Sequence, residues 1–201
     1  MPPVFELGGG RELPEKSIIL LQPKPELAEA AADYYRRNWT FLAPYEPLRE
    51  MDFFTVAHQR QILEGEACAW SQRTAYRFYL SLSTEPERII GMIGLSSIVW
   101  GAFRSAFLGY KLDQEHRNCG YMTWAVDQVV QFAFSNIGLH RIEANVMPRN
   151  TPSLRVLEKN GFSSEGLAKH YLSIHGVWED HIHMVRLNYA MHGPGDTALL
   201  P

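Results

Sequence analysis

The chain has 201 residues, of which 46% are apolar, 12% aromatic and 20% charged, and its formal net charge is -3. This composition is typical of a globular protein and excludes the disordered and fibrous classes, and the length suits one domain with a sizeable core. Proteins that bind the phosphate backbone of nucleic acid need a basic surplus, which this chain lacks. We therefore expect no direct nucleic-acid partner.

The cysteines Cys68 and Cys119 lie far apart in the sequence. Two such residues make neither a disulfide framework nor the paired spacing of a zinc site, so a reducing compartment is indicated. Residues 1–10 lack the basic and then apolar pattern of a signal peptide. Apolar runs such as 18–21 fall far short of the roughly twenty residues that a membrane span needs. These features predict a cytoplasmic protein that spans no membrane.

The ends of the chain carry no hydrophobic periodicity, which predicts an N-terminal arm over 1–15 and a C-terminal tail over 191–201 around a single domain at 16–190. Within that domain, apolar spacing and Pro/Gly punctuation predict an alternating series of strands and helices. The predicted strands are 17–22, 76–83, 89–99, 106–112, 141–146, 168–174 and 178–187, and the predicted helices are 25–38, 51–66, 122 to about 138, and 150–160.

The three strands between 76 and 112 follow one another closely, with 85–88 as the expected turn between the first two, and should form an antiparallel meander. The helix and strand that follow add a β-α-β unit. This order predicts an α/β (α+β) fold with a mostly antiparallel mixed sheet of about seven strands. About four helices in total cover its two faces.

The segment 108–123 reads as a strand, a loop containing Gly120, and the start of a helix. Free backbone N–H groups and the helix dipole make such a terminus suitable for an anion, so a pyrophosphate could bind there. An ordinary loop-to-helix turn is the alternative. In the second informative segment, 141–162, Asn150 or Thr151 is expected to cap a helix and Ser153 to lie in its first turn. Capping alone would also explain these residues.

Together the two segments resemble the GNAT acetyltransferases. Arg117, Gly120 and, imperfectly, Met122 match the family's acetyl-CoA loop Arg/Gln-x-x-Gly-x-Gly/Ala, and Asn150 and Ser153 match its Asn-x-x-Ser, followed by Gly161-Phe162. The resemblance covers about 16–188, and the segment 38–47 is similar to the substrate-side helix linker of the Rim-type ribosomal-protein-alanine N-acetyltransferases. It implies a GNAT-like three-layer sandwich. The chain departs from the pattern at Trp124, where a glutamate is frequent.

The resemblance implies acetyl-CoA as co-substrate and a primary amine as acceptor, first the N-terminal α-amine, on Ala or Ser, of a ribosomal protein. Ser153 would protonate the departing CoA thiolate, and Asn150 would bond the pantetheine arm or order water. No metal ion is implied. The implied acetyl-CoA-binding residues are Tyr110, Leu112, Arg117, Asn118, Cys119, Gly120, Tyr121, Met122, Asn150 and Ser153.

A general base is harder to assign, because an α-amine with a pKa of about 8 is already partly neutral near pH 7. Glu46, in the linker, is the first candidate, although a solvated loop glutamate is the alternative. Glu143 is the second, although a cross-strand partner near Arg141 could equally explain it. His181 and His183 alternate on one strand face but lack a recognisable third metal ligand.

Two other functions stay open from the sequence. A small amine such as a polyamine, amino acid or aminoglycoside could be the acceptor, or the chain could be a catalytically inactive acetyl-CoA-binding module. A monomer and a homodimer are equally compatible with the sequence.

Overall fold

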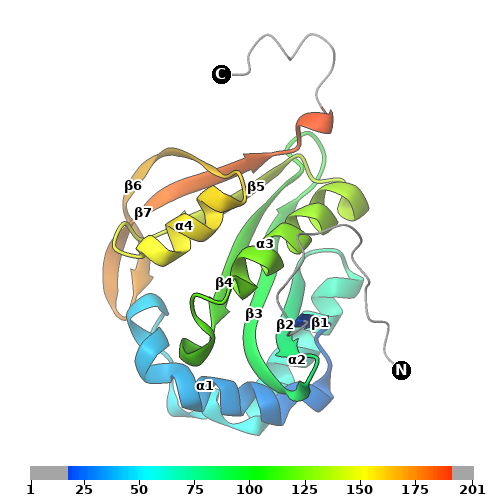
Figure 1. Cartoon of the computed structure of the whole chain (residues 1–201), viewed down its shortest axis with the longest axis vertical. Helices are drawn as coiled ribbons and strands as arrows, with labels where there is room; N and C mark the ends of the chain where they lie inside the picture. Colours follow the sequence, from blue (N-terminus) through cyan, green and yellow to red (C-terminus); the bar gives the residue numbers. More distant parts are fainter. Residues whose placement is uncertain (1–17, 192–201) are drawn as a thin grey trace.

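The computed structural model describes residues 18–191. Its helices and strands follow the predicted order, so the α/β class and the alternation of elements are confirmed (Figure 1). The expected arm, and the tail beyond Met191, lie outside the described residues. The strands are β1 (Ile18–Leu21), β2 (Tyr76–Leu82), β3 (Glu85–Val99), β4 (Ser105–Leu112), β5 (Arg141–Val146), β6 (Ser163–Ile174) and β7 (Val177–Leu187), and the helices are α1 (Ala28–Leu42), α2 (Val56–Ser71), α3 (Tyr121–Gln131) and α4 (Thr151–Lys159).

The strands form one seven-stranded sheet in the order β1-β2-β3-β4-β5-β7-β6. Among the strands of residues 18–191, only the β4–β5 pair is parallel, and every other neighbouring pair is antiparallel. The parallel pair exists because α3 carries the chain across the sheet between β4 and β5, as the predicted β-α-β unit requires. The meander of β2, β3 and β4 is likewise confirmed.

Helices cover both faces of the sheet, as Figure 1 shows for α3 and α4 in front and α2 behind. The core on the first face joins the sheet to α3 and α4, with Val126 and Leu157 fully buried. The core on the second face joins α1 and α2 to β2 and β3 through Tyr34, Leu63 and Tyr79. The three layers of the predicted sandwich are therefore present. Across residues 18–191 no helix has both the length and the apolar character that crossing a membrane requires.

The prediction of a turn at 85–88 is wrong, because these residues belong to β3 and the turn is Ser83–Thr84. Glu85 pairs with Leu82 and Ile89 with Ser81, so the three residues between them form a bulge. Pro86 lies in this bulge, where its missing N–H breaks no ladder hydrogen bond. Proline in the sequence therefore marked an irregularity within the strand, not its end.

Other boundaries differ by less. The predicted helix 51–66 is a short 3₁₀ turn at Met51–Phe54 followed by α2, which begins where the Thr55 hydroxyl accepts a hydrogen bond from the His58 N–H. β6 begins at Ser163, five residues before the predicted 168, because Ser163 already pairs with Val185. The first residues of this edge strand are polar and exposed, so they show no alternation of apolar and polar side chains.

Candidate active site

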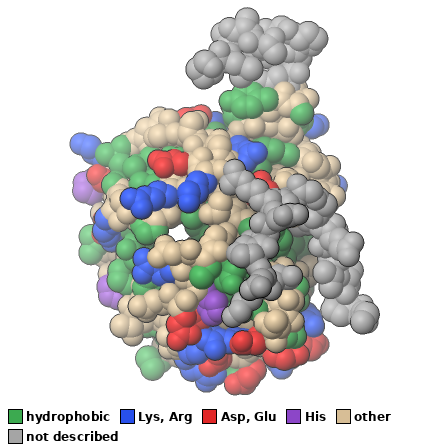
Figure 2. All heavy atoms as spheres, viewed as in Figure 1, with side chains coloured by type: hydrophobic (Ala, Val, Ile, Leu, Met, Phe, Trp, Pro, Cys, Tyr) green, Lys and Arg blue, Asp and Glu red, His purple; other side chains and the backbone are tan. Residues whose placement is uncertain are grey.

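The parallel pair β4–β5 opens into a gap. The two strands pair only where Ser105–Phe107 lie beside Arg141–Glu143. Beyond this point β4 stays with β3 as far as Leu112, and β5 stays with β7 as far as Val146. Figure 2 shows an opening through the molecule beside β4 and the beginning of α4. The sheet therefore offers unpaired backbone groups on both sides of a cleft.

Side chains of β4 alternate across this cleft, as the period of two requires. Tyr110 and Leu112 pack with the core under α3 and α4. Lys111 points to the other face, where its Nζ lies 2.5 Å from Glu46 and 3.4 Å from the Tyr35 hydroxyl of α1. One strand thus presents groups to both faces of the gap.

The loop after β4 ends at the N-terminus of α3, where several backbone N–H groups have no intrahelical partner. Gly120 caps α3 with a φ of +80° and offers no side-chain hydrogen bond to the helix. The first bond of the helix runs from the Trp124 N–H to the Gly120 carbonyl, so the N–H groups of 121–123 have no partner one turn back. A Cβ on Gly120 would meet no atom within 4 Å, so the space before the helix is open. These features fit a pyrophosphate group.

The other loop residues implied by the resemblance surround this helix end. Arg117 stacks on Phe41 of α1 at 5.2 Å from its ring centre, and Cys119 is exposed. Asn118 has a φ of +61°, which turns the chain sharply before Gly120. The side chains of Tyr121 and Met122 are buried in the core. Tyr121 and Met122 can therefore offer a ligand their backbone groups only.

Asp113 fastens the loop to α1. Its carboxylate is buried, receives a hydrogen bond from the Arg37 guanidinium and accepts the Glu115 N–H at 3.0 Å. Asn38 adds a bond from the Gln114 N–H to its Oδ1. Burial pushes the pKa of Asp113 upward, but the Glu115 N–H and Arg37 outweigh it and hold the pKa below its usual value. The loop is thereby fixed to α1 ahead of the N-terminus of α3.

We expect Asp113→Asn to lower the free energy of unfolding by about 3 kcal/mol at pH 7, because it leaves Arg37 without its buried partner. Because the pKa of Asp113 is lower in the folded than in the unfolded protein, ionised Asp113 stabilises the fold fully above the unfolded pKa of about 3.9. This contribution is lost as the pH falls from there through the folded-state pKa. Urea unfolding at pH 7 and at pH 3 measures both effects. The difference in unfolding free energy between the wild type and Asp113→Asn should be smaller at pH 3 than at pH 7.

Glu115→Gln is the matched control, because Glu115 is exposed and pairs with Arg88 at the surface. Its unfolding free energy should stay within about 0.5 kcal/mol of the wild type. Equal losses in both variants would contradict the role assigned to Asp113.

The start of α4 brings Asn150, Ser153 and Tyr110 together. Asn150 caps the helix through its Oδ1, which accepts the Ser153 N–H at 3.4 Å. The Ser153 hydroxyl lies 2.8 Å from the Tyr110 hydroxyl, which comes from β4 on the opposite side of the gap. Asn150 therefore performs the capping that the sequence offered as the alternative, and Ser153 lies at the cleft.

Glu46 lies on the other face, beside Lys111. Its carboxylate is only 12% exposed, and Arg49 lies 3.5 Å away as a second cation. The linker around it is attached to the far side of the cleft, because the Glu46 carbonyl accepts the His175 N–H and the Pro44 carbonyl accepts a bond from Arg149. Glu46 is thus a partly buried carboxylate at the gap and not a solvated loop residue.

Glu143 lies where β4 and β5 are still paired, opposite Phe107. Its Oε1 accepts the Arg141 Nε–H at 2.8 Å and lies 3.4 Å from the Ser105 hydroxyl. Arg141 also binds Glu165, which completes a three-residue ion-pair network. The structure thus places Glu143 beside the Arg141 neighbour that the sequence offered as its alternative explanation.

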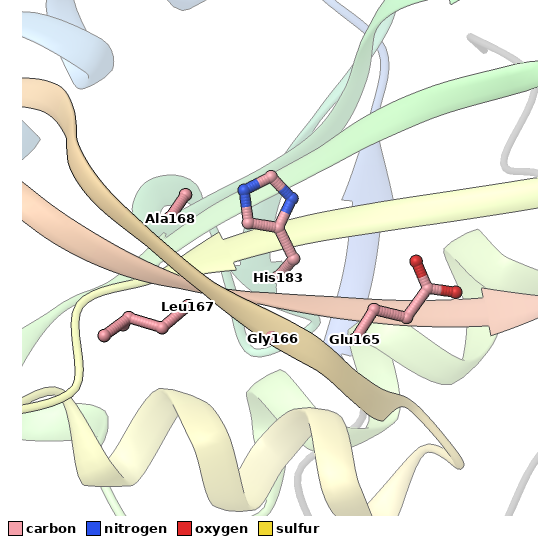
Figure 3. Close-up of a pocket in the computed structure, with 5 residues that line it drawn as sticks. All are labelled: Glu165, Gly166, Leu167, Ala168 and His183. Atoms are coloured by element: carbon pink, nitrogen blue, oxygen red, sulfur yellow. The ribbon is translucent and has the colours of Figure 1, made fainter.

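A hollow of about 260 Å³ lies at the bulge of β6. It is lined by Glu165, Gly166, Leu167, Ala168 and His183, and in Figure 3 the His183 and Ala168 side chains point to the same side of the strands. His181 bonds the Glu179 carbonyl. Within residues 18–191 no cluster of three or more metal-ligating side chains is present.

The sequence of residues 17–163 matches the acetyltransferase (GNAT) domain. The chain belongs to the GNAT acetyltransferase family. A GNAT relative, the "Probable N-acetyltransferase YjcK" of Bacillus subtilis (strain 168), is 41% identical over 161 residues, which cover 80% of this chain and 88% of that protein.

Two solved GNAT structures have the same fold. The ribosomal-protein-S5-alanine acetyltransferase from Vibrio fischeri superimposes with a TM-score of 0.85 at 34% identity, covering 92% of this chain and all of that one. RimJ of Mycobacterium smegmatis, in complex with CoA-disulfide, gives a TM-score of 0.84 at 29% identity, covering 92% of this chain and 88% of that one. This GNAT chain is an acetyl-CoA-dependent N-acetyltransferase.

Sequence reasoning missed three side chains at this GNAT site. These are Lys111, Asp113 and the Tyr110 hydroxyl, each of which forms a hydrogen bond with a residue 43 to 76 positions away in the chain. Strict alternation on the strand before the loop was the available signal, because it places Tyr110 and Lys111 on opposite faces. The partners themselves could not be read from the sequence.

Proposed function

We propose that this enzyme transfers the acetyl group of acetyl-CoA directly to the N-terminal α-amine, on Ala or Ser, of a ribosomal protein. The observation that carries the reaction is the β4–β5 gap with Ser153 on one face and Glu46 on the other. The likeness to the alanine acetyltransferase of Vibrio fischeri supports the acceptor, since it extends over 92% of this chain.

The cleft suits acetyl-CoA in two ways. The N–H groups of 121–123 and the loop from Arg117 would hold the pyrophosphate, where the helix dipole favours negative charge. The backbone of Tyr110 and Leu112, on the side of β4 that β5 leaves free, would pair with the amides of the pantetheine arm. The thioester supplies an activated acetyl group, and the protein fixes its position.

The two proton transfers of the reaction would take place on opposite faces of the β4–β5 gap. Only a neutral amine can attack the thioester carbonyl, so an α-amine that arrives protonated has to release a proton before the attack. Glu46 would accept that proton from the α1 side, through water or directly. Ser153 would donate a proton to the CoA sulfur from the α4 side as the carbon–sulfur bond breaks.

Glu46→Gln is expected to lower kcat by about 10-fold at pH 7, because a neutral amide cannot accept the proton. The loss should shrink as the pH rises above about 8, where an α-amine is neutral without help. Steady-state rates between pH 6.5 and 9, as thiol release, measure this dependence.

Glu143→Gln is the comparison, since it removes a carboxylate that is equally exposed and likewise ion-paired, with Arg141, but that lies where β4 and β5 still pair. We expect its rate at pH 7 to stay within about twofold of the wild type, provided that the fold is kept. A pH-independent loss in Glu46→Gln, or a larger loss in Glu143→Gln, would transfer the role of base away from Glu46.

The acceptor is tested by incubating the purified protein with acetyl-CoA and two pools, stripped ribosomal proteins and a panel of small amines. Free thiol release and product mass are followed together. We expect one added acetyl group on a ribosomal protein that begins with Ala or Ser, and none on the same protein with its N-terminus blocked. Release with small amines alone would replace the proposal with metabolite acetylation. Binding of acetyl-CoA without transfer to either pool would favour an inactive binding module.

A further inference from the structure

Tyr110 crosses the β4–β5 gap. Its side chain leaves β4 on the face that carries α3 and α4, and its hydroxyl ends 2.8 Å from the Ser153 Oγ and 3.1 Å from the Ser153 carbonyl oxygen. Ser153 belongs to the helix that follows β5, so this contact joins the two sides where the strands have already separated. The side-chain hydroxyl is distinct from the backbone groups of Tyr110 that face the pantetheine arm.

The Tyr110 hydroxyl can form hydrogen bonds in two arrangements, because both the carbonyl oxygen and the Oγ of Ser153 lie within reach. When Tyr110 donates to the carbonyl oxygen, its own oxygen can accept the Ser153 hydroxyl proton. When it donates to Ser153 Oγ, the Ser153 proton is free to point at a third group. A hydroxyl that accepts a hydrogen bond also becomes a stronger donor, because each bond in such a chain polarises the next. The second arrangement is the one that a serine acid needs.

Tyr110 is suited to donate and not to act as a base. Burial raises the pKa of its hydroxyl far above the usual value, and the bond with Ser153 offsets only part of that effect. The phenol therefore keeps its proton throughout the neutral range. Its ring is packed among the residues of the core under α3 and α4, so the hydroxyl is held in place from behind.

We propose that Tyr110 is a positioning residue, whose hydroxyl donates to Ser153 Oγ and directs the Ser153 proton to the CoA sulfur. This inference rests on the proposed function of Ser153. As the carbon–sulfur bond breaks, sulfur keeps the electron pair and takes the Ser153 proton. The acceptor nitrogen releases one proton to water as the amide forms, water returns one proton to Ser153 Oγ, and Tyr110 stays protonated.

Tyr110→Phe tests the proposal, because it removes the hydroxyl and keeps the ring. We expect kcat to fall about 10-fold while the KM for acetyl-CoA stays within about twofold, since one hydrogen bond to the acid is lost and no binding group is. In the Ser153→Ala background the same change should have no further effect, because the two residues act as a unit. Thermal unfolding of each variant checks the fold.

A second readout needs no acceptor. The pKa of the thiol of bound CoA, followed by thiolate absorbance in the ultraviolet, should rise in Ser153→Ala and shift in the same direction in Tyr110→Phe. Tyr79→Phe is the control for loss of a tyrosine hydroxyl, since Tyr79 is fully buried and its hydroxyl binds Glu66 at 2.7 Å. It should leave both kcat and the thiol pKa unchanged.

The outcomes separate the two proposals. Wild-type values of kcat and thiol pKa in Tyr110→Phe, or additive losses in the double variant, would overturn the role of Tyr110 while leaving the acetyl transfer intact. A protein that fails to bind CoA, or a Ser153→Ala variant with an unchanged thiol pKa, would overturn the function assigned to Ser153 and the inference with it.

Discussion

A Gly120→Glu variant is expected to bind acetyl-CoA roughly 1000-fold more weakly than the wild type, as measured by calorimetric titration. The new carboxylate would stand before the N–H groups of α3, where the pyrophosphate is proposed to bind. Two like charges about 4 Å apart repel by about 4 kcal/mol at the effective dielectric constant of a protein surface. That energy corresponds to about three decades in a dissociation constant.

Gly101→Glu separates this effect from backbone strain. Gly101 lies between β3 and β4 with a φ of +74°, close to the +80° of Gly120, and a Cβ at either position would meet no atom within 4 Å. The two variants therefore carry the same side chain and a similar conformational cost. We expect Gly101→Glu to bind acetyl-CoA as the wild type does. Equal affinity in Gly120→Glu would remove the anion site from the end of α3.

Ser153→Ala is expected to lower kcat by about 100-fold, the low end of what a positioned proton donor contributes. Acetyl-CoA affinity should remain nearly intact, because the Asn150 cap bonds the Ser153 backbone N–H, which alanine keeps. Single-turnover thiol release together with calorimetric titration distinguishes loss of chemistry from loss of binding.

Thr151→Ala is the control for the helix itself, since it removes an exposed hydroxyl from the same first turn of α4. It should leave kcat within about twofold of the wild type. Undiminished turnover in Ser153→Ala would exclude Ser153 as the acid, whereas a matching loss in Thr151→Ala would assign the effect to the helix start.

Much of the fold could be predicted from local patterns. The apolar spacing of α3, the alternation of β5 and the Asn150–Pro152 start of α4 each depend on neighbours within one or two turns, and the structure has them in place. Where the prediction failed, at Pro86, a bulge in the pairing with β2 absorbed a residue that locally signals a turn. The partner strand decides whether such a proline is tolerated.

The candidate site divides along the same line. The helix start at Gly120 and the first turn that contains Ser153 are local motifs, so they could be recognised in the sequence. The contacts of Glu46 with Lys111, of Arg37 with Asp113, and of Tyr110 with Ser153 join residues from different elements. No spacing rule gives them, because they depend on where the strands lie in the sheet.

By itself the sequence determined the order of elements, the family resemblance and the two motifs, since each is written within a short stretch of chain. Only the tertiary structure decided which carboxylate reaches the cleft. The sequence makes Glu46 and Glu143 equally plausible, and both are ion-paired in the structure, Glu46 with Lys111 and Glu143 with Arg141. Lys111, however, lies on the open part of β4, whereas Glu143 lies where β4 and β5 still pair. The reason is physical: β4 and β5 separate after three paired residues, and only side chains beyond that point face a cleft.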